Sequence, residues 1–316
     1  DNNAATIALK DATGTSDVLD ITLKNATATT KASLTAATVT GFETVKVHAL
    51  SGGVGSVNDV SLAANTTVAS LTIDGTAPVK VTTGGNLNRV GGVTIDASGI
   101  TFVGDATTSA FEITGNLLKG SSVVGTATVD TITTTGDVAG TSGEYVSYNA
   151  GGGDDAISST ISAINNTGAA KASLKIDGGA GTDTLTFTDA SPLNVVDANF
   201  QYLTNIEKLA YGAGVINVTT GGFFDANFKT NGVTFTDTTV GANAITWDSS
   251  TFTGAATIKL TGAQTTQNTV ITTGNGADSI TFDVGAAHTS GTVNINGGAG
   301  NDTIAYTGRA NVASLG

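Results

Sequence analysis

Two nine-residue segments constrain the fold of this chain more than any other feature of its sequence. Residues 178–186 read GGAGTDTLT, and residues 297–305 read GGAGNDTIA. Both fit the nonapeptide G-G-x-G-x-D-x-U-x, where U is a large apolar residue, and this pattern indicates a calcium-binding parallel β-roll. Glycines permit a tight turn with positive φ and leave carbonyl groups uncovered. The aspartate adds a charged oxygen, and calcium takes about six to eight oxygen ligands.

Two imperfect copies follow the same frame, at residues 150–158 (AGGGDDAIS) and 273–281 (TGNGADSIT). In a chain with 42 glycines, ordinary glycine–aspartate turns are the alternative interpretation. Four copies, each with a large apolar residue two positions after the aspartate, favour calcium. The candidate side-chain ligands are Asp154, Asp155, Asp177, Asp183, Asp278, Asn296 and Asp302. The candidate carbonyl ligands belong to Gly151, Gly153, Gly179, Gly181, Gly274, Gly276, Gly298 and Gly300.

Four further acidic residues lie near the same pattern with weaker support. Asp17 and Asp130 have the acid and the following apolar residue but lack the glycines, so an aspartate in a plain turn is the favoured interpretation. Glu43 and Glu207 each follow a large apolar residue and precede a predicted strand. They would either bind a further calcium ion or accept backbone hydrogen bonds in a turn, and the second alternative is favoured.

The spacing of strand-like segments predicts the architecture. In the second half, short runs recur about every 10–13 residues, centred near Ile258, Val270, Ile280, Ile295 and Ile304. Two strands and two turns therefore take about 24 residues, which is also the separation of Asp278 and Asp302. We expect an all-β fold, a parallel β-helix or β-roll-like solenoid with calcium-binding loops, in which each turn buries its apolar side against its neighbours.

Helical patterns are short, and the acidic residues suggest an internal duplication. Residues 191–209, with Asp197 as a candidate N-cap, and residues 223–232 each predict a brief helix, whereas residues 159–173 are the best candidate for a loop. Five acidic landmarks recur in the same order in the two halves: Asp17, Glu43, Asp96, Asp130 and Asp155, then Asp183, Glu207, Asp248, Asp278 and Asp302. We therefore expect two solenoid halves, residues 1–170 and 171–316, in one continuous elongated array cut from a longer protein.

Composition excludes several classes of function. The formal charge of −13, with 26 acidic and 13 basic residues, argues against nucleic-acid binding, which needs a patch of Lys and Arg to meet phosphates. The chain has no cysteine, so neither a disulfide framework nor a thiolate metal site can form. No apolar run approaches the length of a membrane span. His48 and His288 are 240 residues apart and are expected to be surface residues rather than zinc ligands.

The two full nonapeptides resemble the RTX repeats of proteins exported by type I secretion. The Thr-, Ala-, Gly-, Asn- and Val-rich texture and the segment TGFETV at 40–45 make the chain similar to RTX-type surface-layer (S-layer) proteins of Gram-negative bacteria, such as Caulobacter-like surface-layer proteins. The resemblance implies a secreted protein on the cell surface, calcium-dependent folding, and self-assembly of its own copies into a two-dimensional lattice. It also implies anchoring to lipopolysaccharide through a region outside this chain. Because the nonapeptides here are isolated rather than tandem, one or two ions per stacked pair of loops are expected.

Three functions are compatible with these observations. The leading expectation is a structural S-layer segment that folds and assembles with calcium and is not an enzyme. The second is an RTX adhesin segment that binds another cell or a glycan. The third is a polysaccharide lyase or hydrolase on a parallel β-helix, which is disfavoured because 13 basic residues spread over 316 positions form no clustered groove, and no Ser/His/acid spacing stands out.

Overall fold

The computed structural model describes most of the chain. The described residues are 6–10, 13–25, 27, 29–62, 67–83, 87, 89–105, 108–134, 145–164, 174–212, 214–238, 244–261, 268–285, 291–308 and 311–315. They divide into two compact units, of which unit 1 comprises Asp1–Ser158 and Lys171–Asp183, and unit 2 comprises Ser159–Ala170 and Thr184–Gly316. Nearly all regular structure is parallel β-sheet, so the predicted all-β parallel solenoid is confirmed.

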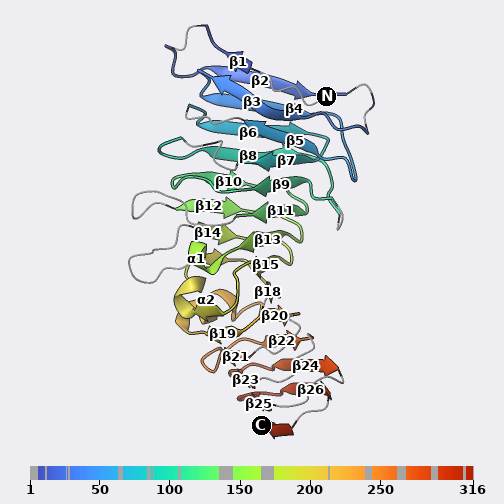
Figure 1. Cartoon of the computed structure of the whole chain (residues 1–316), viewed down its shortest axis with the longest axis vertical. Coiled ribbons are helices and arrows are strands. Elements are labelled where there is room, and N and C mark those ends of the chain that lie inside the picture. The colour runs from blue at the N-terminus through green and yellow to red at the C-terminus, as the bar shows by residue number, and fades with distance from the viewer. Residues whose placement is uncertain are drawn as a thin grey trace. The chain divides into compact units, whose positions relative to one another are not determined.

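Unit 1 is a coil in which successive strands alternate between two parallel sheets (Figure 1). The first sheet contains β1 (Thr6–Ala8), β3 (Leu34–Thr40), β5 (Asn58–Leu62), β7 (Val79–Thr82), β9 (Phe111–Thr114), β11 (Asp130–Thr133) and β13 (Ala156–Ser159). The second contains β2 (Val18–Leu23), β4 (Thr44–Ala49), β6 (Ser70–Gly75), β8 (Thr94–Ile100), β10 (Ser122–Val124), β12 (Val146–Asn149) and β14 (Leu174–Asp177). Val18 pairs with Thr44, and Thr44 with Ser70, so one turn takes 26 residues here.

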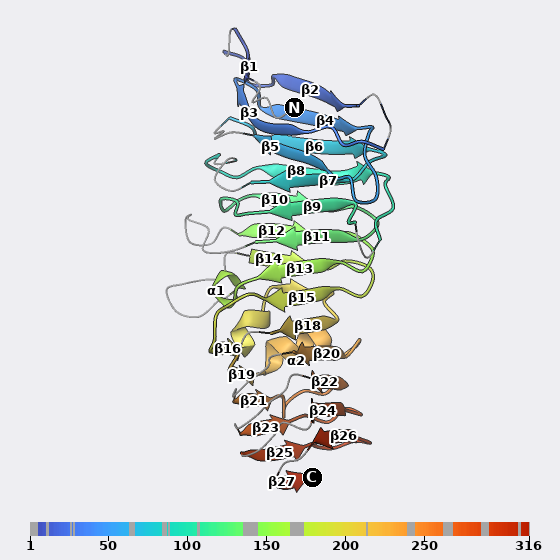
Figure 2. The ribbon, with the colours of Figure 1, turned by 45° about the vertical axis from the view of Figure 1, so that its right-hand side comes forward.

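Unit 2 repeats this alternation (Figure 2). One sheet contains β15 (Thr184–Phe187), β18 (Lys208–Tyr211), β20 (Val233–Asp237), β22 (Ala256–Leu260), β24 (Ser279–Gly285) and β26 (Thr303–Gly308). The other contains β16 (Leu193–Val196), β19 (Ile216–Thr219), β21 (Ile245–Asp248), β23 (Thr269–Thr272), β25 (Thr292–Asn296) and β27 (Asn311–Leu315). The short strand β17 covers Leu203–Thr204. Ser279 pairs with Thr303, which confirms the predicted 24-residue turn.

Alternation of side chains along each strand builds the core. In β4, Val45, Val47 and Ala49 point inward and are fully buried, whereas Thr44, Lys46 and His48 point outward. This period of two is what an extended strand with one buried face requires. Each buried Val, Leu or Ile contributes about 1.5–3 kcal/mol relative to exposure. The strands predicted near Ile258, Ile280 and the other three centres are all present as β22 to β26.

In the described segments, short helices interrupt the coil in unit 2 but not in unit 1. The predicted helix at 223–232 is present as α2 (Gly222–Phe228), and the 3-10 helix η1 (Asp197–Phe200) lies within the other predicted segment. The N-cap of η1 is Val196, so the predicted N-cap Asp197 is wrong; the Asp197 carboxylate instead accepts the N–H groups of Phe223 and Phe224 in α2. Phe200 and Phe224, from η1 and α2, meet edge to face with ring centroids 4.9 Å apart, and both are fully buried. A four-residue helix, α1 (Ile161–Ile164), occupies the start of the predicted loop 159–173, so that part of the prediction is wrong; the remainder lies outside the described residues.

The predicted recurrence of five acidic landmarks holds only in part. In unit 2, Glu207 and Asp278 precede strands of the same sheet, β18 and β24. In unit 1, Asp130 opens β11, but Glu43 precedes β4, which belongs to the other sheet. The predicted equivalence of Glu43 and Glu207 is therefore wrong, because an acid followed by an apolar strand occurs at either bend of a turn. The duplication of residues 1–170 and 171–316 as a whole stays a prediction.

Candidate metal centre in the glycine–aspartate corners

The four glycine–aspartate motifs occupy the same kind of bend. We call residues 150–155, 178–183, 273–278 and 297–302 the glycine–aspartate corners; each leads from the end of one strand to the start of the next. In three of them, an amide or carboxylate at the end of the preceding strand accepts a backbone N–H of the corner: Asn149, Asp177 and Asn296. Asp177 Oδ1 accepts the N–H of Gly179 at 3.1 Å, and Asn296 Oδ1 accepts that of Gly298 at 2.9 Å. These two candidate ligands thus each use one oxygen to form the turn.

The glycines are required by the stacking of one corner on the next. Gly151, Gly179 and Gly298 have φ of 101°, 93° and 79°, a region that residues with a Cβ rarely adopt. A Cβ on Gly179 would also collide with the carbonyl oxygen of Gly151, one turn earlier. The same holds for Gly181 over Gly153, Gly298 over Gly274 and Gly300 over Gly276. The carbonyl groups of the earlier corner therefore point into the layer between two stacked corners.

Some of these carbonyls already hold the stack together. Gly151 O accepts the N–H of Ala180 at 3.0 Å, and Gly274 O accepts that of Ala299 at 2.9 Å. A carbonyl oxygen has two lone pairs, so one hydrogen bond leaves a second acceptor site. The carbonyls of the earlier corner in each stacked pair thus face this layer, and those of Gly151 and Gly274 have part of their capacity used by the backbone.

The motif aspartates form a ladder of carboxylates, buried at Asp155, Asp183 and Asp278 and partly exposed at Asp302. Oδ1 of each accepts the N–H of the residue one turn earlier. In unit 1, Asp130 N–H donates to Asp155 at 2.7 Å, and Asp155 N–H donates to Asp183 at 2.8 Å. In unit 2, Ala256 donates to Asp278 at 2.7 Å, and Asp278 donates to Asp302 at 3.0 Å. Each aspartate therefore satisfies a backbone donor at the start of a strand, which sequence reasoning did not foresee.

Among the residues that the structure describes, the second oxygen of two of these aspartates finds no hydrogen-bond partner. Oδ2 of Asp155 and Oδ2 of Asp278 are buried, and each residue is only 2 % exposed. Burial raises the pKa of Asp155 to about 8, and the charges of Asp130, Asp183 and Asp154 add to that rise. A buried carboxylate oxygen without a donor is energetically costly, and a bound cation is one way in which a protein compensates such a group.

Asp130 provides an internal contrast because protein groups satisfy both of its oxygens. Oδ1 accepts the N–H of Phe111 and the hydroxyl of Thr126, both at 2.9 Å, and Oδ2 accepts the N–H of Thr126 at 2.5 Å. Burial still raises the pKa of this carboxyl, to about 7. Thr126 was not singled out in the sequence; its position four residues before an aspartate that lacks the glycine frame is the signal that could have found it.

The remaining acidic candidates are less enclosed. Asp154 is exposed, and its Oδ1 accepts the N–H of Thr182 from the next corner at 2.9 Å. Glu43 Oε2 accepts the N–H of Asp17 at 2.9 Å, which is the backbone hydrogen-bonding role favoured for it from sequence. Glu207 O accepts the N–H of Thr234. None of these contacts requires a metal ion.

The donor set of the corners suits a hard cation. Carboxylate and carbonyl oxygens, without sulfur or imidazole, are what calcium prefers. Within the described ranges, however, no group of three or more acidic or histidine side chains converges on one point. Main-chain carbonyls would therefore have to complete any coordination sphere around the unpartnered oxygens of Asp155 and Asp278. The residues therefore fit calcium provided that glycine carbonyls supply the remaining oxygen ligands.

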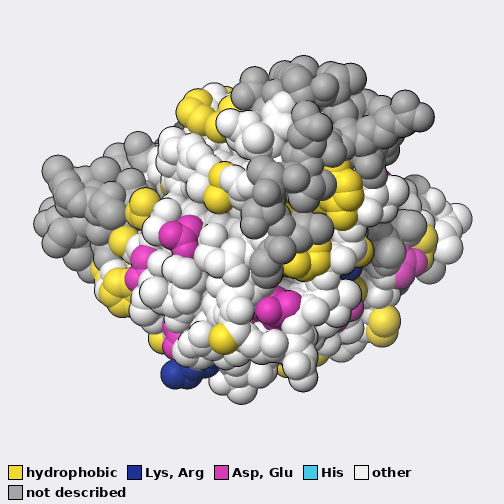
Figure 3. Space-filling model, turned by 90° about the horizontal axis from the view of Figure 1, so that it is seen from below, with side chains coloured by type: hydrophobic (Ala, Val, Ile, Leu, Met, Phe, Trp, Pro, Cys, Tyr) yellow, Lys and Arg dark blue, Asp and Glu magenta, His cyan; other side chains and the backbone are white. Residues whose placement is uncertain are grey.

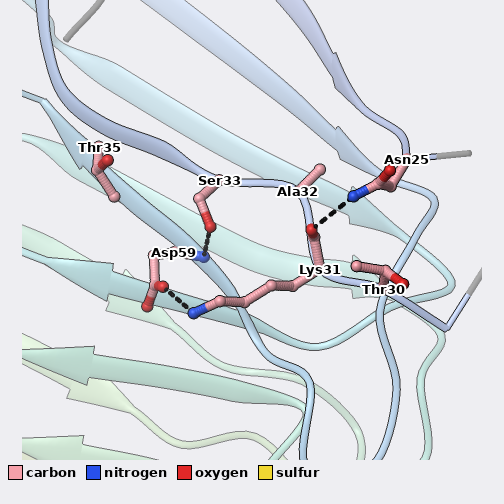
Figure 4. Close-up of a pocket in the computed structure, with 7 residues that line it drawn as sticks. All are labelled: Asn25, Thr30, Lys31, Ala32, Ser33, Thr35 and Asp59. Atoms are coloured by element: carbon pink, nitrogen blue, oxygen red, sulfur yellow. Dashed lines mark hydrogen bonds and ion pairs between the residues drawn. The ribbon is translucent and has the colours of Figure 1, made fainter. Parts of the chain in front are cut away.

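A groove in unit 1 offers no comparable chemistry (Figure 4). It has a volume of about 530 Å³ and is lined by Asn25, Thr30, Lys31, Ala32, Ser33, Thr35 and Asp59. Lys31 Nζ lies 2.7 Å from Asp59 Oδ2, and Asn25 Nδ2 donates to the carbonyl of Lys31. Its two charged groups pair with each other, and these lining residues include neither a histidine nor a second acid. On the face drawn in Figure 3, acidic side chains are scattered among groups of other types and do not merge into one large patch.

Comparison with known proteins adds no relative. No protein-family model, curated protein or solved structure matches the chain. Among the described residues, no helix is long and apolar enough to cross a membrane.

Proposed function

We propose that this chain is a calcium-stabilised structural segment of a secreted surface-layer protein. The observation that carries the calcium part is the pair of buried oxygens in the stacked corners, Asp155 Oδ2 and Asp278 Oδ2, for which the described residues supply no donor. Calcium would be held by these oxygens, by the neighbouring carboxylates Asp183 and Asp302, and by glycine carbonyls in the layer between corners. The ion supplies two positive charges and a link between successive turns.

The structural part of the proposal rests on the repeated turn, in which each strand pairs with the strands of the neighbouring turns. In the part of the chain that the structure describes, the buried acids Asp155 and Asp278 accept backbone hydrogen bonds between successive turns of a solenoid. The RTX-like nonapeptides, the composition free of cysteine and the charge of −13 agree with an extracellular, calcium-dependent coat. Assembly of copies into a lattice, a surface location and anchoring to lipopolysaccharide outside this chain belong to the same proposal.

Two measurements test these parts separately. Isothermal titration with calcium should show binding at roughly 10⁻⁴–10⁻³ M, the range of extracellular calcium modules, and Asp155→Asn combined with Asp278→Asn should remove it. The absence of calcium binding to the wild-type protein would refute the metal centre. Electron microscopy after dialysis into calcium should show ordered sheets that disperse in chelator. Dispersed particles in both conditions would refute assembly, and glycan or cell binding without sheets would favour an adhesin.

A further inference from the structure

A histidine bridges two carboxylates on the outer face of unit 1. Three strands that follow one another in the second sheet carry the group: β2, β4 and β6, in each of which the apolar side chains point inward. His48 in β4 is in register with Asp74 in β6 and with Thr22 in β2. Its Nδ1 lies 2.5 Å from Asp74 Oδ1, and its Nε2 lies 3.0 Å from Asp20 Oδ1. The residues are 28 and 26 positions apart, so the group joins three successive turns.

These two contacts determine the protonation state of the ring. A neutral imidazole carries one N–H and one lone pair, whereas a carboxylate only accepts hydrogen bonds. With a carboxylate at each nitrogen, a neutral ring would set its lone pair against a carboxylate oxygen. Only the imidazolium form donates to both. The hydrogen bond to Asp74 is the largest cause of a raised pKa of His48, and the charges of Asp74 and Asp20 add to it, although burial opposes the rise.

Few other charges face the group. Lys46 lies two residues before His48 on the outer face of β4, in register with Asp20, and Lys24 follows the end of β2. On the far side of β6, Asp74 and Asp96 of β8 both line a hollow of about 180 Å³, and its lining residues include no Lys or Arg. The inward neighbours Val47 and Ile73 are buried and apolar. Asp74 therefore has an acid on one side and depends on His48 on the other for a counter-charge.

We propose that Asp20, His48 and Asp74 form a pH-sensitive clamp that ties three turns of unit 1 together while the histidine is protonated. Loss of the proton removes one of the two donors and leaves two carboxylates without the cation between them. The strands then keep their backbone pairing but lose the side-chain tie. This clamp is independent of the glycine–aspartate corners, which lie elsewhere in the chain.

The direction of the pH dependence follows from proton linkage. The pKa of His48 is higher in the folded protein than the ordinary value of about 6.5. The folded state therefore binds this proton more tightly than the unfolded state, so stability falls as pH rises through the interval between the two values. The contribution of the clamp is complete below pH about 6.5 and is lost as pH passes the raised value.

Proton NMR of the imidazole signals tests the clamp directly. The chain has two histidines, so His48→Gln identifies the signals of His48, while His288 lies outside the described residues. We expect His48 to titrate at higher pH in the native protein than in the same protein unfolded in urea. Asp74→Asn should lower the midpoint most and Asp20→Asn less. Asp59→Asn, which removes an acid paired with Lys31, should leave it unchanged. A native midpoint equal to the unfolded one, or unaffected by Asp74→Asn, overturns the clamp.

A stability measurement separates a functioning clamp from a mere contact. Urea unfolding of the wild-type protein and of His48→Gln, in one fixed concentration of chelator, gives their difference in stability at about pH 6 and about pH 9. The wild-type advantage should shrink at the higher pH, because only the wild-type clamp can lose its proton. An advantage that is equal at both pH values, or larger at pH 9, refutes the proposal.

Discussion

Replacing Asp155 with asparagine separates two roles of its carboxylate: accepting a backbone hydrogen bond and binding the proposed calcium ion. The amide oxygen still accepts the N–H of Asp130, so the rung of the ladder is kept. The charge is removed, and an NH₂ group takes the place of the unpartnered Oδ2. Because burial and its acidic neighbours raise the pKa of Asp155 to about 8, the calcium-free protein already holds this proton at pH 7, and asparagine resembles the protonated acid. Without calcium, the change in unfolding free energy should be within about 1 kcal/mol.

With calcium, the same substitution should become costly. A site filled at a hundred times its dissociation constant stabilises the folded state by about 2.7 kcal/mol. For a site of about 10⁻⁴ M, this corresponds to about 10 mM calcium. A unit of roughly this size shifts its melting temperature by about 2–4 °C per kcal/mol, so the wild-type protein should gain about 5–10 °C. Asp155→Asn should lose most of that gain, as should Asp278→Asn in unit 2.

Asp130→Asn is the matched control, and differential scanning calorimetry with calcium or chelator is the assay. Both oxygens of Asp130 accept hydrogen bonds from Phe111 and Thr126, so an amide must leave one buried N–H unpaired. This costs about 1–3 kcal/mol with or without calcium. The reasoning fails if chelator leaves the wild-type melt unchanged, or if Asp155→Asn is equally harmful in both conditions. The glycine–aspartate corners would then be hydrogen-bonded turns only.

Three further predictions concern pH, the glycines and the aromatic core. In chelator, the melting temperature of His48→Gln should fall as pH rises from about 4 to about 8, because burial raises the pKa of Asp155 to about 8 and that of Asp130 to about 7. Calcium should make this fall smaller, and a fall that calcium leaves unchanged would contradict competition between calcium and protons. Gly151→Ala should lower the free energy of unfolding in urea by at least about 2 kcal/mol, since the φ of Gly151 is 101° and a Cβ would meet the carbonyl of Thr126. At the neighbouring Gly152 a Cβ would make only ordinary contacts, so Gly152→Ala should be nearly neutral, and equal effects of the two changes would refute the stacking argument. Phe224→Ala should lower the free energy of unfolding by about 3–5 kcal/mol, because it removes a fully buried ring. Phe223 is 42 % exposed, so Phe223→Ala should cost under about 1 kcal/mol, and similar losses for the two variants would contradict the described core.

The parts of the fold that the sequence predicted are those encoded locally. The period of 24 residues between Asp278 and Asp302 is the register of β24 with β26, since each motif repeats at the same bend of successive turns. The helix at 223–232 is readable because its apolar residues recur at helical spacing. In contrast, the sheet to which Glu43 belongs depends on how many bends lie between it and Asp130, and loops of variable length hide that number.

The side-chain partners were harder to predict because they depend on register between turns. His48 reads as a surface residue in isolation, and its partnership with Asp20 and Asp74 is visible only once the chain is folded at about 26 residues per turn. Asp237 has no glycine frame and yet is 1 % exposed within β20. The motif aspartates were expected to point at a metal, whereas the first oxygen of each accepts a backbone hydrogen bond, which a pattern of residue types cannot reveal.

The backbone hydrogen bond to Oδ1 of each motif aspartate makes the second oxygen, Oδ2, the atom that bears on metal binding. A bend of this solenoid can satisfy the donor of the previous turn with a neutral side chain: Asn58 Oδ1 accepts the N–H of Ala32 at 2.7 Å, and Ser121 Oγ accepts that of Val93 at 3.0 Å. A buried aspartate that accepts the same hydrogen bond also carries a charge removed from water, which costs free energy and which the hydrogen bond does not require. At Asp130 the extra oxygen is used by Thr126, but at Asp155 and Asp278 no group among the described residues uses it. Asparagine or serine would serve the backbone equally well, so aspartate at these corners is what the proposed calcium ion would require, because the ion needs the charge.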